Sequence, residues 1–196
     1  VIPTVSPFLL PRVLPRLRRA YPALRLFLVE EQTARLIAKL GDGAIDCALI
    51  ALPYESGAVE SESLGEDRFH LVVPKTHALA KEKRVTPAKA RAETLLLLED
   101  GHCLKGHALS ACGLARPRAR DAFGATSLFT LVQMVDNGLG VTLLPELAIE
   151  SGLLKGTGLV AVPVEGEPSR ELALIWRKGT ARGPEFRLLA KALARV

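Results

Sequence analysis

The sequence has 196 residues, a formal net charge of +5, 48% hydrophobic residues and 24% charged residues. This length is enough for one large domain or two small lobes with a buried core, and the apolar fraction is too high for a disordered chain. No apolar run approaches the ~20 residues of a membrane-spanning helix. The 3 cysteines are an odd number, which argues against a secreted disulfide scaffold. We therefore expect a cytoplasmic protein with no membrane partner.

The basic residues do not gather on one DNA-docking helix. Four arginines between residues 12 and 19 fit the solvated side of an amphipathic helix, and three between residues 116 and 120 lie in a connector that contains proline. No helix-turn-helix, zinc-finger or RNA-binding pattern accompanies them. The chain opens on Val1, Ile2, Pro3 and Thr4, which is typical of a strand that ends in a loop. We therefore expect the chain to be a piece of a longer protein.

The first predicted element is a helix over residues 6–17 with one apolar face. Ser6 is suited to the N-cap and Pro7 to the first helical position. Pro11 and Pro15 remove helical donors, so we expect this helix to be short or bent.

Strands and helices then alternate along the chain. The predicted strands are residues 24–29, 46–52, 69–73, 95–98, 141–144, 159–164 and 172–176. The predicted helices are residues 32–40, a stretch that starts near 86, residues 127–137 and residues 184–194, and residues 55–63 are expected to form a polar loop. This alternation predicts the α/β class with a doubly wound lobe, and the apolar run at 46–52 is typical of a strand buried in a parallel sheet. Connections near 66–70 and 165–172 predict two lobes with a ligand cleft between them.

The most informative segment surrounds Cys103. This cysteine follows a strand and a glycine turn, so we expect it at a helix N-terminus, where the helix dipole and the nearby His102 and Lys105 favour a thiolate. A thiolate attacks peroxides and gives a sulfenic acid, which condenses with a second thiol such as Cys112. If the segment is helical, nine steps of ~1.5 Å separate the two Cα atoms by about 13 Å, whereas a disulfide tolerates roughly 7 Å. Disulfide formation would then require the segment to unwind.

Other interpretations of these residues remain open at this point. Two cysteines nine positions apart are also compatible with two ordinary small hydrophobic side chains. His102, Cys103, His107 and Cys112 are competent metal ligands, but their spacing matches no common zinc module, so we expect no metal and no cofactor. Cys47 lies in an apolar strand and is expected to be structural.

A set of motifs spread over the whole chain resembles one family. The motif Glu-Asp-Gly-His-Cys-Leu occupies residues 99–104, and the other matching segments are residues 2–5, 9–11, 31–33, 43–50, 125–128 and 138–145. In this order they resemble the OxyR family of LysR-type, hydrogen-peroxide-sensing transcription regulators. The segment at 138–145 is generic to LysR-type effector domains, whereas the cysteine motif is specific to the peroxide sensors.

The resemblance implies a two-lobed regulatory domain of the periplasmic-binding-protein type 2 fold, with two crossover segments. Residues 1–67 and 170–196 would form lobe I, and residues 68–169 would form lobe II with the redox cysteines. A winged helix-turn-helix DNA-binding domain and a linker helix would precede this chain.

The resemblance also implies the roles of individual residues. Cys103 would react with peroxide and Cys112 would resolve the sulfenic acid to an intramolecular disulfide. Thr4, Thr33 and His102 match positions that line the family's peroxide pocket, where hydroxyl and imidazole groups orient the peroxide. Arg170 matches an arginine that favours the thiolate.

One departure from the family pattern follows the cysteine motif. Members commonly have Arg-Asp-Gln there, whereas this chain has Lys105, Gly106 and His107. Glycine lowers helix stability by up to ~1 kcal/mol relative to alanine. We therefore expect this segment to rearrange at least as readily as in other members.

The sequence thus predicts the redox-sensing regulatory domain of a transcription factor rather than an enzyme. The partners implied are hydrogen peroxide, further copies of the chain in a homodimer or homotetramer, promoter DNA through the preceding domain, RNA polymerase, and a thiol reductant that resets the switch. The alternative is a LysR-type effector domain that binds an organic metabolite in the interlobe cleft, with incidental cysteines.

Overall fold

The computed structural model describes residues 1–111, 113 and 125–194. The chain divides into two units, unit 1 (Val1–Glu66 and Glu171–Val196) and unit 2 (Asp67–Arg170), so the chain passes from one unit to the other twice. Cys112 and the three arginines at 116–120 lie outside the described residues. No helix among the described residues is long and apolar enough to cross a membrane.

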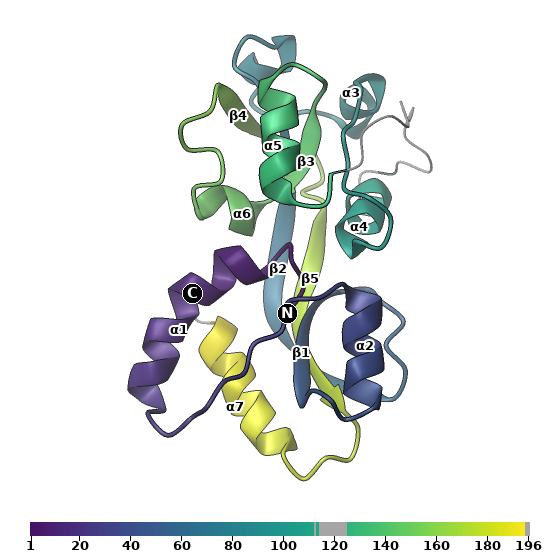
Figure 1. Cartoon of the computed structure of the whole chain (residues 1–196). Coiled ribbons are helices and arrows are strands. Elements are labelled where there is room, and N and C mark those ends of the chain that lie inside the picture. The colour runs from purple at the N-terminus through teal and green to yellow at the C-terminus, as the bar shows by residue number, and fades with distance from the viewer. Residues whose placement is uncertain (112, 114–124, 195–196) are drawn as a thin grey trace. The chain divides into compact units, whose positions relative to one another are not determined.

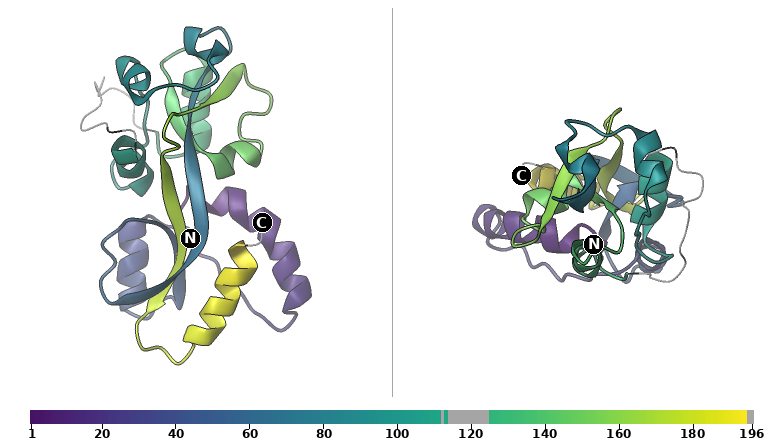
Figure 2. Two further views of the ribbon diagram at one scale, coloured as in Figure 1. Left: turned by 180° about the vertical axis from the view of Figure 1, so that it is seen from behind. Right: turned by 90° about the horizontal axis from the view of Figure 1, so that it is seen from above.

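Unit 1 combines three helices with a small sheet (Figure 1). Its elements are α1 (Ser6–Ala20), α2 (Thr33–Gly41), β1 (Cys47–Leu52), the first part of β2 (Val59–Pro74), most of β5 (Ser169–Arg177) and α7 (Gly183–Ala194). β1 runs antiparallel to β5, from Cys47 opposite Trp176 to Leu52 opposite Glu171. Helices α1 and α7 pack against each other, as Figures 1 and 2 both show.

Helix α1 is longer than its prolines predict. The helix continues to Ala20 through Pro11 and Pro15, and it begins at Ser6, so the predicted N-cap role of Ser6 is wrong. The N-cap is Val5, with no side-chain hydrogen bond. All three prolines of α1 lie on its exposed face. The carbonyl groups that lose their helical donors therefore face water, which reduces the cost of each proline.

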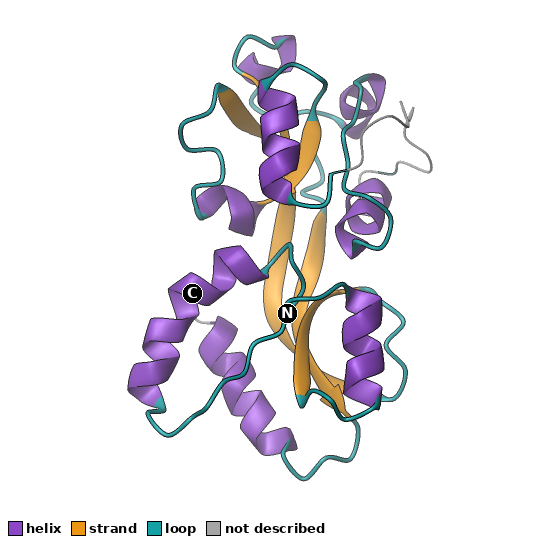
Figure 3. Cartoon of the chain, viewed as in Figure 1, coloured by secondary structure: helices purple, strands orange, loops and turns teal. Residues whose placement is uncertain are grey.

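Two expectations for unit 1 are wrong. Residues 22–32 form neither helix nor strand, although residues 24–29 have the pattern of a strand (Figure 3). Within the described residues β1 has only the antiparallel neighbour β5, not the expected parallel one. The expected burial of β1 is confirmed, because residues 48–51 are all buried.

Unit 2 is built on the second part of β2, which lies between β3 (Thr142–Pro145) and β4 (Leu159–Pro163) and is antiparallel to both. The helices of the unit are η1 (Ala78–Lys81), α3 (Pro87–Ala92), α4 (Cys103–Ala111), α5 (Leu128–Asp136) and α6 (Glu146–Glu150). Thr86 and Ser127 cap α3 and α5 by accepting hydrogen bonds from Lys89 N and Thr130 N, both at 3.2 Å.

Two details of unit 2 and its borders differ from the expectations. β2 begins at Val59, so the expected polar loop at 55–63 is in part a strand with alternating exposure. Residues 95–98 make only isolated bridges, Leu95 to Val141 and Leu98 to Ala125. Gly140 is required at the first of these bridges, because a Cβ there would collide with the carbonyl oxygen of Thr94.

A buried ion pair joins the two ends of unit 2. Arg170 donates to Asp67 Oδ2 from Nε at 3.0 Å and from Nη2 at 2.8 Å, and both side chains are almost fully buried. Asp67 Oδ1 also accepts from Leu147 N at the start of α6, at 3.0 Å. Nearby, Phe69 N donates to the Pro168 carbonyl at 2.7 Å. The two chain passages between the units are thus tied together at their unit 2 ends.

We predict that Asp67→Ala lowers the free energy of unfolding by about 3–5 kcal/mol, because it removes the carboxylate from a buried guanidinium. Urea denaturation followed by circular dichroism measures this loss. The control is Glu31→Ala, which removes the exposed ion pair with Arg35 and should cost less than about 1 kcal/mol. A loss no larger for Asp67→Ala than for the control would contradict the structural role of the pair.

Candidate functional site

Cys103 is the first residue of α4, as its sequence context predicts. The preceding turn is held by Glu99 N, which donates to Ala125 O at 3.0 Å, and by Gly101, whose φ of 97° suits glycine. The side chain of Cys103 is half-buried. Its position at the N-terminus of a nine-residue helix places the positive end of the helix dipole beside the sulfur. This arrangement favours a thiolate.

The charged neighbours of Cys103 form a small exposed group. Lys105 Nζ lies 2.8 Å from Asp100 Oδ1, and Lys105 N donates to the His102 carbonyl at 3.1 Å. His102 is half-buried directly before the cysteine. The structure thus brings His102, Cys103 and Lys105 together at one helix start. The Lys105 charge that was expected to favour the thiolate is shared with Asp100, which sequence reasoning did not single out.

Helix α4 is held by few apolar contacts of its own. Leu104 and Ala108, one helical turn apart, are the two side chains of residues 103–110 that are buried. Gly106 is exposed, and a Cβ there would meet no atom within 4 Å. At the end of the helix, Gly113 N donates to Ser110 O at 3.0 Å and Arg91 Nη1 donates to Gly113 O at 3.3 Å. A short helix with two apolar anchors and a glycine has low intrinsic stability.

The two predicted threonines belong to unit 1, whereas His102 and Cys103 belong to unit 2. Thr4 lies in the turn before α1 and is 3% exposed, and Thr33 is the first residue of α2 and is 2% exposed. Thr33 Oγ1 is buried and has no hydrogen-bond partner among the described residues. A buried hydroxyl without a partner costs about 1–3 kcal/mol, which is typical of a group that awaits a polar ligand.

Cys47 has a different environment from Cys103. It is the first residue of β1, and its free thiol is half-buried. Burial, and secondly the charge of Asp46, raise the pKa of the Cys47 thiol to about 11. A thiol with this pKa is protonated at neutral pH and is a poor nucleophile.

The fold and the site together define a two-lobed α/β regulatory domain of the periplasmic-binding-protein type 2 class. The family model described as the LysR substrate binding domain matches residues 1–196. The chain belongs to the LysR substrate-binding domain family.

Two curated relatives illustrate the family. The chain is 39% identical over 194 residues to the DNA-binding transcriptional dual regulator OxyR of Escherichia coli K12, covering 98% of this chain and 63% of the relative. It is 36% identical over 197 residues to the HTH-type transcriptional regulator EstR of Acinetobacter baylyi, covering 100% of this chain and 65% of the relative. The chain therefore spans less than two thirds of the length of these relatives.

Solved structures of peroxide regulators are also similar. The reduced regulatory domain of OxyR2 from Vibrio vulnificus matches with a TM-score of 0.90 and 39% identity, covering 98% of this chain and 91% of that one. The oxidized form of OxyR matches with a TM-score of 0.87 and 39% identity, covering 98% and 91%. A hydrogen-peroxide-bound mutant of Corynebacterium glutamicum OxyR matches with a TM-score of 0.92 and 33% identity, covering 99% and 62%.

We predict a large difference in reactivity between the two described cysteines. At pH 8 a thiol with a pKa of about 11 is only ~0.1% thiolate, so iodoacetamide should modify Cys103 at least about tenfold faster than Cys47. The Cys47 rate should rise about tenfold per pH unit between pH 7 and 10, because the thiolate fraction rises at that rate below the pKa. Peptide mass spectrometry follows each site.

The control is the unfolded chain in guanidinium, where both cysteines should react at similar rates. Equal rates for Cys47 and Cys103 in the folded protein would contradict the assignment of Cys47 as a structural thiol.

Proposed function

We propose that this chain is the redox-sensing regulatory domain of a LysR-type transcription factor and that hydrogen peroxide oxidises Cys103. The observation that carries the proposal is the position of a half-buried cysteine at the first residue of α4, directly after His102. The names of the relatives, which include hydrogen peroxide-inducible genes activators, agree with it.

The chemistry is a two-step oxidation of thiols. The Cys103 thiolate attacks one peroxide oxygen, an S–O bond forms, the O–O bond breaks, and the departing hydroxide takes a proton and leaves as water. We assign the supply of that proton to His102, the residue directly before Cys103. The Cys112 thiolate then attacks the sulfenic sulfur, which expels the hydroxyl as a second water and leaves a Cys103–Cys112 disulfide. A dithiol reductant reverses the change by thiol–disulfide exchange.

The helical geometry of α4 couples this chemistry to a change of shape. Eight steps of ~1.5 Å separate the Cα atoms of Cys103 and Ala111 by about 12 Å, and Cys112 follows one residue later. A disulfide needs Cα atoms within roughly 7 Å of each other. The disulfide therefore requires α4 to unwind, which removes Leu104 and Ala108 from their buried positions.

The proposal assigns Thr4, Thr33 and His102 to peroxide binding from the family's pattern. The buried Thr33 hydroxyl supports this role, because it needs a polar partner. Arg170 is assigned to favouring the thiolate. The Nε and Nη2 atoms of Arg170 donate to Asp67, and the charge of that carboxylate offsets the charge of the guanidinium. We therefore expect Arg170 to act mainly by positioning the chain segments at the ends of unit 2.

The proposal extends to the longer protein. We assign unit 1 to lobe I and unit 2 to lobe II, so that Asp67 and Arg170, which the sequence analysis expected in lobe I, belong to lobe II. A DNA-binding domain precedes the two lobes. In the cytoplasm, oxidation alters the packing of a homodimer or homotetramer, which changes promoter binding and contact with RNA polymerase. The reaction is stoichiometric signalling, so the protein is not an enzyme and needs no cofactor.

A second candidate is an effector domain that binds an organic metabolite, with incidental cysteines. It is favoured by the relative EstR, whose name does not mention peroxide. This candidate predicts a ligand-induced rise in melting temperature that survives Cys103→Ser.

Thiol trapping tests the peroxide-sensing proposal. Substoichiometric hydrogen peroxide, followed by alkylation and peptide mass spectrometry, should yield an intramolecular Cys103–Cys112 disulfide in the parent and in Cys47→Ser. Cys112→Ser should stop at a sulfenic acid on Cys103, which dimedone captures, and Cys103→Ser should show neither product. An unmodified Cys103 in the parent would overturn the proposal.

We further predict that Gly106→Ala slows disulfide formation by about fivefold, because alanine stabilises the exposed helical position by up to ~1 kcal/mol. Stopped-flow measurement separates disulfide formation from the preceding oxidation of Cys103 by peroxide. The rate at which peroxide oxidises Cys103 should stay the same, because a Cβ added at Gly106 would meet no atom within 4 Å. An unchanged or faster disulfide step would show that unwinding of α4 does not limit the rate.

A further inference from the structure

An ion pair spans Cys103 at the start of α4. Lys105 Nζ lies 2.8 Å from Asp100 Oδ1, so the pair joins a residue that precedes the cysteine to one that follows it. Lys105 is in the first turn of the helix, whereas Asp100 precedes the helix. Ion pairs along one helix face join residues three or four positions apart, and this pair differs because half of it lies outside the helix. The pair therefore closes a short loop of the chain with Cys103 inside it.

The Asp100 end of this loop follows a segment that is anchored in unit 2. Leu98 is 3% exposed and forms a bridge with Ala125, and Glu99 N donates to Ala125 O at 3.0 Å. Asp100 comes directly after these two residues. Because the backbone before Asp100 is held in this way, the ion pair ties the first turn of α4 to a fixed part of the unit.

The Asp100–Lys105 pair is exposed to solvent. The side chain of Asp100 is 94% exposed and that of Lys105 is 31% exposed. An exposed pair contributes little to the stability of a whole fold, and salt screens it. For α4 a small contribution is significant, because Leu104 and Ala108 are the only buried side chains of residues 103–110. A change at the first turn of α4 should therefore alter how often this helix opens.

The two charges of the pair have opposite effects on the sulfur of Cys103. The positive charge of Lys105 favours the thiolate, and the negative charge of Asp100 disfavours it. The Asp100 carboxylate also lies on the N-terminal side of α4, where a negative charge stabilises a helix. Asp100 therefore stabilises α4 while it lowers the reactivity of the first residue of that helix.

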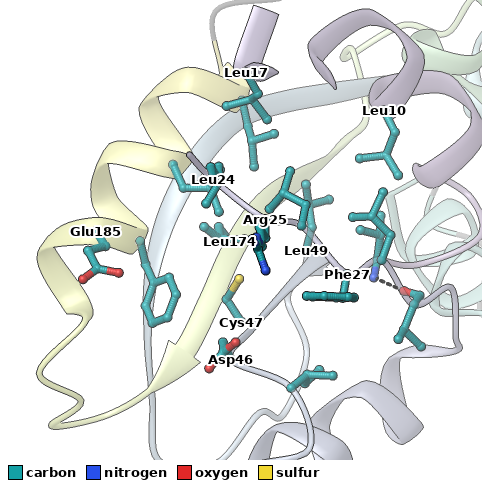
Figure 4. A pocket seen from close by; sticks show the side chains of 18 of the residues that line it. Leu10, Leu17, Leu24, Arg25, Phe27, Asp46, Cys47, Leu49, Leu174 and Glu185 are labelled. Atoms are coloured by element: carbon teal, nitrogen blue, oxygen red, sulfur yellow. Dashed lines mark hydrogen bonds between the residues drawn. The ribbon is translucent and has the colours of Figure 1, made fainter. Parts of the chain in front are cut away.

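The other described cysteine has a different kind of neighbouring ion pair. Cys47 lines an apolar groove of unit 1 with a volume of about 620 Å³, and Figure 4 shows Asp46 beside it. Asp46 Oδ1 lies 2.9 Å from Nη1 of Arg182, which directly precedes α7. This pair joins two distant parts of the chain, so it closes no short loop around Cys47. A carboxylate before a cysteine is therefore not enough, and Lys105 completes the arrangement at Cys103.

We propose that Asp100 and Lys105 are positioning residues of the redox switch, whose ion pair holds Cys103 at the start of α4 and must open before Cys112 can reach the sulfur. The inference rests on the proposed oxidation of Cys103 and adds two residues to it. The pair slows the step in which the Cys112 thiolate attacks the sulfenic sulfur, the S–S bond forms, the S–O bond breaks and water leaves. In the earlier attack of Cys103 on peroxide, Asp100 and Lys105 act only through their charges.

Two substitutions separate the ion pair from the charges. Asp100→Asn and Lys105→Met both remove the pair, so each should speed disulfide formation by about two- to threefold. On the oxidation of Cys103 by peroxide at neutral pH the two should act oppositely, with Asp100→Asn about twofold faster and Lys105→Met about twofold slower than the parent. Rapid quenching by alkylation, followed by peptide mass spectrometry, measures both rates.

Two further variants serve as controls. Glu99→Gln removes an exposed carboxylate that makes no ion pair with a described residue, and it should leave disulfide formation at the parent rate. Lys105→Arg restores a cation that can pair with Asp100, and it should return both rates from those of Lys105→Met towards those of the parent. Disulfide formation at the parent rate in both Asp100→Asn and Lys105→Met would overturn the inference, as would an equal acceleration by Glu99→Gln.

Hydrogen exchange in the reduced protein tests the ion pair without peroxide. Amides of residues 106–110 should exchange about two- to threefold faster in Asp100→Asn and Lys105→Met than in the parent. Salt at about 1 M should remove most of this difference, because it screens the pair in the parent. Amides of residues 142–145 in β3 report that unit 2 is folded in each protein. If the parent forms no Cys103–Cys112 disulfide, the proposed function fails, whereas equal exchange of α4 in the parent and both variants contradicts the role of the ion pair itself.

Discussion

The two-unit fold depends on one buried ion pair. The chain leaves unit 1 and returns to it through segments that carry Asp67 and Arg170, and the two hydrogen bonds that Arg170 donates to Asp67 Oδ2 join these segments at the ends of unit 2. Burying a carboxylate and a guanidinium costs several kcal/mol per ion, and the opposite charge of the partner together with the hydrogen bonds between them offsets this cost. Asp67 uses its second oxygen to hold Leu147 N at the start of α6. The Asp67 carboxylate therefore holds both chain passages between the units and the start of α6. These contacts explain why a charged pair occupies a buried place where two leucines would also pack.

The two described cysteines show how environment decides thiol chemistry. Cys47 starts a strand beside Asp46, where burial and a negative neighbour disfavour the thiolate. Cys103 starts a helix, where the dipole and free N–H groups favour it. Residue type alone does not distinguish the two cysteines. The glycine turn before Cys103 and the apolar run around Cys47 do.

Much of the local structure could be predicted from the sequence. Caps at Thr86 and Ser127, the burial of β1 and the helix start at Cys103 all follow from short-range patterns, which act through neighbouring residues. The predictions that were wrong depend on contacts between residues that are far apart in the sequence or on which side of a helix faces water. The prolines of α1 are tolerated because they share the exposed face, and residues 24–29 form no strand because a strand requires a paired neighbour. The contact of Asp67 with Arg170 spans 103 positions, and no local pattern predicts such a pair. The grouping of His102, Cys103 and Lys105 was predictable because it is local, whereas the unpaired Thr33 hydroxyl required knowledge of its burial.

Under the proposed function, the stability of α4 sets how oxidation of Cys103 is transmitted to the rest of the domain. A helix with many buried side chains would hold the two cysteines apart and stop oxidation at the sulfenic acid. A segment with none would form the disulfide without changing the rest of the domain. α4 lies between these limits, because Leu104 and Ala108 are buried while the other residues of 103–110 are at least partly exposed. A Cys103–Cys112 disulfide would have to supply the free energy that exposes Leu104 and Ala108, about 2–3 kcal/mol by transfer values. That cost is small beside the free energy released when peroxide oxidises two thiols to a disulfide. In the proposed mechanism, the exposure of these two side chains is what makes the oxidised domain differ in shape from the reduced one.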